Sequence, residues 1–306
     1  MNSRNTLFAY LALAAVCIIW GTTYLAIRIG VMDFPAFLFS GVRQIIAGII
    51  LSAFMLTLGK VKWPSKKELM IQAIGGFFMI TLGNGFVGYG EVYVSSGLAA
   101  IICSMMPIWV ILINLKVSED EKPTVPVIVG LIIGLSGILL IFREHLGEFS
   151  NPVYTVGIVM IFIANLGWAG GSVWMKRKNQ HSNAFLNAGL QMFFGGVFML
   201  PASLAFDDYT NVVWTTDVLY SLIYLILMGS VVAYACYSYA IKKLPMTIVS
   251  MYAYINPLVA VLLGWLVLDE KLNLIIGIAM LTTIAGIYIV NRGYQLRNLW
   301  RAQLSK

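Results

Sequence analysis

Charged side chains are scarce in this chain of 306 residues: only 11% are Asp, Glu, Lys or Arg, whereas 60% are hydrophobic. A soluble domain carries about 25% charged residues. The chain therefore lacks the polar groups needed to cover a water-facing surface, and we expect it to face lipid. The formal net charge of +7 does not indicate a nucleic-acid partner, because the positive charges follow the membrane pattern described below.

Cysteine and histidine are also rare, which argues against metal and disulfide chemistry. Cys17, Cys103 and Cys236 are scattered through apolar runs without a CxxC pair, so we predict neither a disulfide framework nor a metal site. His145 and His181 lie far apart in polar connectors. The sequence contains no Walker motif, and we expect no metal, cofactor or bound ATP.

A membrane-embedded enzyme is an alternative that the same scarcity disfavours. A hydrolase would need an HExxH motif, paired aspartates within the spans or a Ser/His pair, and the apolar runs contain none of these. A lipid-scrambling protein stays open as a further alternative.

Long apolar runs are what the chain has in abundance. Each is long enough, or nearly so, to cross a hydrocarbon core of about 30 Å as a helix, and none alternates with the period of two that a barrel strand needs. We expect an all-α integral membrane protein of about ten helices, with the first run retained and not cleaved as a signal peptide. The runs are 7–27, 36–58, 69–89, 97–115, 125–142, 154–175, 184–206, 218–240, 248–268 and 274–290.

The positive charges predict the orientation of these helices. With both termini in the cytoplasm, most of the 20 Lys and Arg residues fall on the cytoplasmic side, and only Arg28, Arg143 and Lys271 fall outside. Cytoplasmic loops are enriched in Lys and Arg. We therefore predict a multi-pass protein with both termini cytoplasmic.

An internal repeat organises the sequence. Residues 36–49, AFLFSGVRQIIAGI, match residues 184–197, AFLNAGLQMFFGGV, at a spacing of 148 positions, and Trp20 and Trp168 have the same spacing. The repeat predicts two five-helix units, 7–142 and 154–291. Because five is odd, the second unit enters the membrane from the opposite side, which is the inverted arrangement that permits alternating access around a central cavity. We expect the second and seventh helices to face each other across that cavity.

Arg43 is the one charge deep within an apolar run, and its repeat partner is Gln191. A charge at that depth is costly unless it is paired or lines a watery cavity. Arg43 either docks an anionic group of a substrate or forms a structural pair. Glu91 follows the third apolar run, where it pairs with Arg43, contacts an amino group, carries a coupling proton or is a solvated loop carboxylate.

Further candidates are aromatic residues, amides and two prolines. Pro107 and Pro257 fall near the middle of the fourth and ninth helices, where a proline kinks the chain and favours a hinge; packing alone is the alternative. The remaining candidates for substrate binding are neutral, and interface anchoring or helix contact is the alternative for each: Trp20, Tyr24, Asn84, Trp168, Gln191 and Asn256.

Four stretches together resemble one family over nearly the whole chain. WGTTYLAIRIG (20–30), AFLFSGVRQIIAG (36–48), SSGLAAIICSMMPIWVIL (95–112) and LVLDEKLNLIIGIAMLTTIAG (266–286) are similar to the drug/metabolite transporter superfamily of the EamA type. The ordered set carries the resemblance, since no single motif is specific.

The resemblance implies a bundle in which helices 1–4 and 6–9 surround a cavity while helices 5 and 10 pack outside. It also implies efflux of amino acids or other small metabolites across the bacterial inner membrane. The family's arginine falls on Arg43, its fourth-helix proline on Pro107, and its acidic turn on residues 269–271. Gln191 departs from the arginine pattern in the second half.

We therefore predict a secondary transporter that exports amino acids or related zwitterionic or amphipathic metabolites by alternating access. Its partners are a small-molecule substrate, the lipid bilayer and, through Glu91, protons. A sugar or nucleotide-sugar carrier is the alternative within transport. A phosphate-ester antiporter ranks below it, because only Arg43 is deep.

Overall fold

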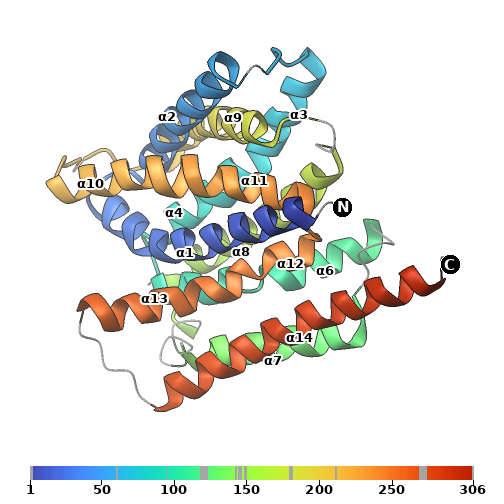
Figure 1. The fold of residues 1–306 in the computed structure, drawn as a ribbon. Coiled ribbons are helices and arrows are strands. Elements are labelled where there is room, and N and C mark those ends of the chain that lie inside the picture. Colours follow the sequence, from blue (N-terminus) through green and yellow to red (C-terminus); the bar gives the residue numbers. More distant parts are fainter. Residues whose placement is uncertain are drawn as a thin grey trace.

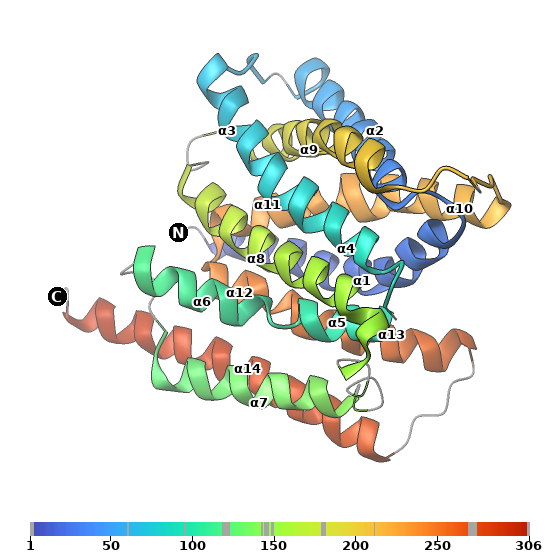
Figure 2. The same ribbon diagram turned by 180° about the vertical axis from the view of Figure 1, so that it is seen from behind.

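The computed structural model describes residues 3–59, 61–94, 96–117, 123–141, 143, 147, 150–178, 182–210, 212–268 and 274–304. Throughout these residues the chain is helical and forms no strand. The helices run side by side in one bundle, and both termini lie at the same end of it (Figure 1 and Figure 2). We call this the basic end, because the lysine-bearing ends of the sixth and eighth spans lie there, and the other the far end.

The first half of the chain contains five spans, some of them composed of several helical segments. Their bounds are α1 (Ser3–Asp33), α2 (Ala36–Thr57), α3 (Lys66–Gly76) continued by η1 (Phe77–Gly85) and α4 (Phe86–Gly90), α5 (Ser96–Cys103) continued by α6 (Met106–Val117), and α7 (Val125–Ile141).

The second half repeats this order. After the short turn η3 (Pro152–Tyr154), its spans are α8 (Thr155–Lys178), α9 (Ala184–Phe206), α10 (Thr216–Tyr224) continued by η4 (Leu225–Val232) and α11 (Ala233–Lys243), α12 (Met246–Ser250) continued by α13 (Tyr252–Leu268), and α14 (Leu274–Leu304).

The expected membrane architecture is confirmed. Eight helices within the described residues are long and apolar enough to cross a membrane, and two shorter apolar helices, Val125–Ile141 and Met246–Val259, complete the ten. The first span is longer than the predicted 7–27. It continues to Asp33 and therefore contains Arg28, which was expected in a loop. The helix tolerates this charge because the Arg28 guanidinium donates to the backbone carbonyls of Glu91 and Val94.

The second and seventh spans do not face each other across a cavity, as the repeat had led us to expect. α2 and α9 pack directly against each other (Figure 1). A Cβ atom on Gly48 would lie 2.7 Å from the carbonyl oxygen of Gly189, and one on Gly196 would lie 2.8 Å from that of Gly41. Small residues allow this close approach, so the repeated glycines serve helix contact and not a cavity wall.

The fifth and tenth spans form a second pair beside the rest of the bundle. α7 and α14 lie together at the bottom of both views (Figure 1 and Figure 2). A Cβ atom on Gly130 would lie 2.8 Å from the carbonyl oxygen of Gly286. This pair of helices leaves the other eight spans to build the interior.

The third and eighth spans each widen into a π-helical segment, and these segments begin 148 positions apart, at Phe77 and Leu225. Such wide turns are rare and occur frequently at functional sites. Asn84 lies in η1 and Ser230 lies in η4. The repeat therefore places an irregular, polar stretch of backbone in each half.

The fourth and ninth spans are interrupted near the two predicted hinge prolines. Pro107 lies near the middle of the fourth span, Leu98–Val117, as predicted, and it is the second residue of α6, directly after a break from α5. Pro257 lies inside α13 and cannot donate to the carbonyl four residues earlier, that of Ala253. The Ser104 hydroxyl donates to this carbonyl at 3.0 Å. The fourth span thus supplies a donor to the backbone of the ninth. Whether they act as hinges stays a prediction.

The start of α2 is capped by the other half of the chain. Pro35 occupies the N-cap position, where it makes no side-chain cap. The Asp207 carboxylate instead accepts from the backbone N–H groups of Phe37 at 3.1 Å and Leu38 at 2.9 Å. In the second half Asn183 caps α9 locally, accepting from Phe185 and Leu186. The two halves are therefore joined by a carboxylate at the far end.

Gly48→Ala should destabilise the bundle, because the added methyl group meets rigid backbone of α9 and not a movable side chain. Overpacking of this kind costs about 1–3 kcal/mol. Thermal unfolding in detergent measures the effect. Gly277→Ala is the control, since nothing lies within 4 Å of a Cβ atom there. Equal melting temperatures for the two variants would contradict the close packing of α2 and α9.

Asp207→Ala should lower the free energy of unfolding by about 0.5–2 kcal/mol, the usual loss on removing an N-cap carboxylate. Asp208→Ala is a matched control, because the neighbouring Asp208 bonds only within its own loop, to Thr210. Denaturant unfolding of both variants tests the cap. An equal loss of unfolding free energy in the two variants would show that negative charge at the far end stabilises the protein and that the cap itself does not.

Candidate functional site

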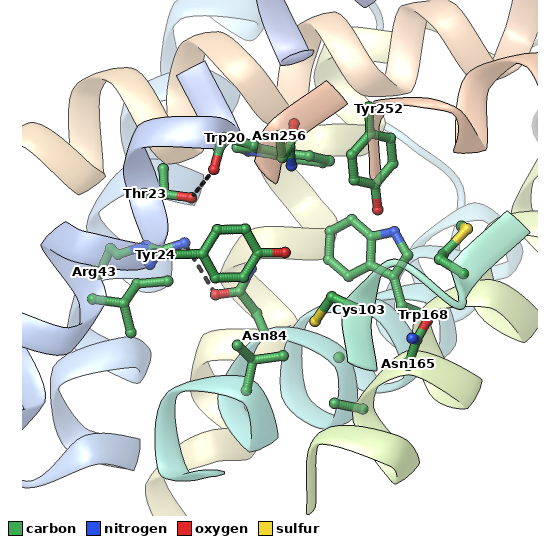
Figure 3. A pocket seen from close by; sticks show the side chains of 15 residues that line it. Trp20, Thr23, Tyr24, Arg43, Asn84, Cys103, Asn165, Trp168, Tyr252 and Asn256 are labelled. Carbon is green, nitrogen blue, oxygen red and sulfur yellow. Dashed lines mark hydrogen bonds between the residues drawn. The ribbon is translucent and has the colours of Figure 1, made fainter. Parts of the chain in front are cut away.

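The interior holds a cavity of about 90 Å³ whose wall comes from α1, α2, η1, α4, α5, α6, α8 and α13 (Figure 3). Most of its lining is apolar or aromatic, with a few polar groups, as in small-molecule sites generally. Six of the eight predicted substrate-binding residues line it: Trp20, Tyr24, Arg43, Asn84, Trp168 and Asn256.

Arg43 is the charged residue of this wall, and only 2% of it is exposed. Its Nη2 atom donates to the side-chain oxygen of Asn84 in η1 at 3.0 Å, and its Nε atom donates to the Ser230 hydroxyl in η4 at 3.0 Å. Two π-helical segments, one from each half, therefore hold the guanidinium. Its Nη1 atom has no hydrogen-bond partner.

A layer of aromatic rings forms the side of the cavity nearest the basic end. Trp20 packs edge-on against Trp168, with 5.4 Å between ring centroids, and against Tyr252 at 4.9 Å. The Trp20 indole donates to the carbonyl of Gly229 at 3.0 Å, and the Trp168 indole donates to the Tyr237 hydroxyl at 3.2 Å. These bonds fix the rings, so the layer is a shaped apolar surface.

The amide of Asn256 contacts backbone instead of pointing freely into the cavity. Its nitrogen donates to the carbonyls of Tyr252 at 2.9 Å and Cys17 at 3.0 Å. These bonds join α13 to α1 beside the cavity. Tyr24 lies between Arg43 and Trp168 as seen in Figure 3, and it spans the distance between the charged and aromatic sides.

Glu91 lies outside the cavity lining, in the turn that follows α4. It is fully buried, and neither carboxyl oxygen has a hydrogen-bond partner. Arg28 and Arg43 interact with it electrostatically, but Arg28 binds its backbone carbonyl and not its carboxyl group. The solvated loop carboxylate and the direct pair with Arg43, both considered from the sequence, are therefore not what the structure contains.

Gln191 does not line this cavity either. Its side chain accepts from the Tyr234 hydroxyl at 2.6 Å and donates to Gln72 at 2.7 Å. It lies in a separate, smaller pocket towards the basic end. The prolines Pro107 and Pro257 are also absent from the cavity lining. The acidic turn at residues 269–271 and the histidines His145 and His181 lie outside the described residues.

Sequence reasoning missed Ser230 and Ser104. Both are hydroxyls within long apolar runs, where serine is common and gives little signal. Ser230 directly follows a glycine, and its partner Arg43 is 187 positions away. The repeat spacing of 148 does not mark Ser230 either, because its partner at that spacing is Leu82.

Comparison with known proteins finds relatives that match nearly the whole chain. The model of the EamA-like transporter family matches it twice, over residues 7–143 and 155–292. The inner membrane transporter YedA of Escherichia coli (strain K12) is 33% identical over 301 residues, which cover 97% of this chain and 94% of YedA. The transporter YoaV of Bacillus subtilis (strain 168) is 28% identical, with 91% of this chain and 95% of YoaV covered.

A solved crystal structure shares the fold, with a TM-score of 0.73 and 18% sequence identity over 95% of this chain and 98% of the other. The two matched repeats, the inverted bundle and the interior cavity agree with one another. The chain belongs to the EamA-like transporter family.

Proposed function

We propose that this membrane transporter exports amino acids or related zwitterionic or amphipathic metabolites by alternating access. The protein lies in the bacterial inner membrane with both termini in the cytoplasm. The repeats 7–142 and 154–291 are the two halves that move relative to each other during transport. The Lys and Arg distribution supports the orientation, and the relative YedA supports the location. The family resemblance supports export.

The unpartnered Nη1 atom of Arg43 is the observation that carries the substrate class. A buried donor without a partner costs free energy. The side chain that carries this donor lines the cavity whose wall also contains the aromatic layer. A carboxylate entering the cavity would satisfy this donor. Asn84 and Ser230 already orient the guanidinium for such a contact.

The aromatic layer supports the amphipathic part of the proposal. Trp20, Trp168 and Tyr252 present rings on the side of the cavity away from Arg43 (Figure 3). A molecule with a carboxylate and an apolar side chain would fit both surfaces at once, with its apolar part against the rings.

A sugar or nucleotide-sugar carrier is the second candidate, and the same rings favour it, because aromatic faces and amides also bind sugars. An amino acid and a neutral sugar differ in their need for a cation, whereas a nucleotide sugar carries phosphate groups and would need one as well. A neutral sugar would use the rings and Asn84 without requiring the charge of Arg43.

Arg43→Ala should weaken amino-acid transport strongly while the protein still inserts and folds. Hydrogen bonds to charged groups contribute about 1.5–3 kcal/mol, which corresponds to about a ten- to hundredfold loss of affinity. Counterflow of labelled amino acids and, separately, of labelled sugars into proteoliposomes measures the change.

Lys62→Ala is the control for that experiment, since this lysine is exposed in the connector before α3. Size-exclusion profiles verify folding of both variants. Normal amino-acid counterflow by Arg43→Ala would give the arginine a structural role. Sugar counterflow that survives the substitution would favour the second candidate.

We propose further that the Glu91 carboxyl group binds and releases a proton during each transport cycle. An ionised carboxylate that is buried without hydrogen bonds is costly, and an ionisable group at this depth is a functional candidate. The groups that face it are Tyr24 and Arg28 of α1, Arg43 of α2 and Cys103 of α5.

Glu91→Gln should remove the response of transport to an imposed pH gradient and leave exchange without a gradient in place, because glutamine keeps the size but binds no proton. Glu91→Asp retains a carboxyl group and should keep part of the response. Uptake into proteoliposomes with the two gradient directions is the measurement. An unchanged response in Glu91→Gln would exclude this carboxyl from proton coupling.

A further inference from the structure

A second pocket of about 10 Å³ lies at the basic end, and it shares two repeat positions with the central cavity. Gln191 and Met175 line it, and these residues are the repeat partners of Arg43 and Ile27, which line the central cavity. Both pairs are 148 positions apart. The repeat therefore connects the two spaces through these two pairs, whereas the other six residues that line the second pocket have no partner in the central cavity lining.

A matching cation lies beside each space. Arg28 near the end of α1 donates to the carbonyls of Glu91 and Val94, at the end of the third span. Its repeat partner Lys176, near the end of α8, donates to the carbonyls of Ile241, at 3.1 Å, and Leu244, after the eighth span. Cations stabilise the carbonyl ends of helices. The surroundings of the two spaces are thus built alike.

A short chain of hydrogen bonds runs through Gln191, which lines the smaller pocket. Tyr234 donates to Gln191 at 2.6 Å, and Gln191 donates to Gln72 at 2.7 Å. Gln72 belongs to α3 of the first half, whereas the other two belong to the second half. Tyr234 also packs 6.0 Å from Trp168, measured between ring centroids, so the chain of bonds connects the aromatic layer to the basic-end pocket.

The residues that line the pocket favour a ligand with an anionic group. The Ser238 hydroxyl is 6% exposed and has no hydrogen-bond partner. Lys176 and Lys242 are also in the lining, and the Lys242 ammonium group donates to the carbonyl of Ser182 at 2.5 Å. Clefts lined by one sign of charge concentrate ligands of the opposite sign. A carboxylate-bearing molecule suits this pocket as it suits Arg43.

We propose that the Gln191 pocket is the basic-end mouth of the transport pathway, the closed counterpart of the Arg43 cavity. The hydrogen bonds from Tyr234 through Gln191 to Gln72 hold it shut. When they break, the pocket widens to admit a small molecule with an anionic group, and the Arg43 cavity narrows. The choice of ligand rests on the proposed function, whereas the reciprocal opening follows from the repeated geometry.

The reaction rates of two thiols measure how accessible the two spaces are. Cys103 lines the central cavity in the native chain, and Ser238→Cys places a thiol in the basic-end pocket, with Cys236→Ala removing its neighbour. The rates at which N-ethylmaleimide modifies the two thiols are measured by peptide mass spectrometry in detergent. Tyr234→Phe then removes one hydroxyl from the closing bonds and leaves the ring.

In Tyr234→Phe the introduced thiol should react about fivefold faster, the factor expected when about 1 kcal/mol of hydrogen bonding is lost, and Cys103 should react more slowly. Tyr239→Phe is the matched control on the same helix, because Tyr239 stacks on Phe185 outside these bonds, and it should change neither rate. Unchanged rates in Tyr234→Phe, or a parallel rise of both, would overturn the inference.

The same assay separates this inference from the proposed function, because thiol reactivity needs no transported substrate. Reciprocal rates together with protection of the introduced thiol by a mixture of L-amino acids would support both. Reciprocal rates without protection would support the Gln191 pocket as the basic-end mouth of the pathway and would count against amino acids as the substrate. Protection without reciprocal rates would overturn the inference and leave the proposed function standing.

Discussion

The cost of unpaired polar groups in hydrocarbon governs this structure. Lipid supplies no hydrogen bonds, so each polar group within a span must find a partner in the protein. The carbonyl that Pro257 leaves without a donor receives the hydroxyl of Ser104. The carbonyl of Gly229 in a wide turn receives the indole of Trp20. Irregular backbone is thus confined to the interior, where other spans satisfy it, and the cavity forms in the same region.

Arg43 obeys the same constraint and connects the two halves through it. Asn84 and Ser230 come from π-helical segments at equivalent places in the repeat, so the duplication that created two wide turns also created a site for one guanidinium between them. Nη1, the nitrogen that they leave unpaired, is buried in a side chain that lines the cavity. Asn84 and Ser230 therefore satisfy two of the three guanidinium nitrogens.

The two halves share their backbone plan and differ in chemistry. Arg28 and Lys176 perform the same task at opposite ends of the bundle. Arg28 binds the carbonyl of Glu91, in the turn after α4, whereas Lys176 binds that of Ile241, in the last turn of α11. Likewise Arg43 faces the larger space while Gln191 takes part in the bonds that close the smaller one. The frame is therefore symmetric, whereas its charge is not.

The sequence by itself determined the ten spans, the repeat and the identity of the buried charge, because hydrophobicity and repetition are written locally along the chain. It also marked six residues that line the cavity. The partners of Arg43, the direct contact of α2 with α9 and the separate position of Gln191 were decided only by the tertiary structure. These features depend on how two halves about 150 residues apart in sequence dock against each other, and the repeat predicts which residues are equivalent without predicting which of them meet. Docking brought glycines of α2 and α9 into contact, so the two copies of the repeated stretch lie side by side and not across a cavity.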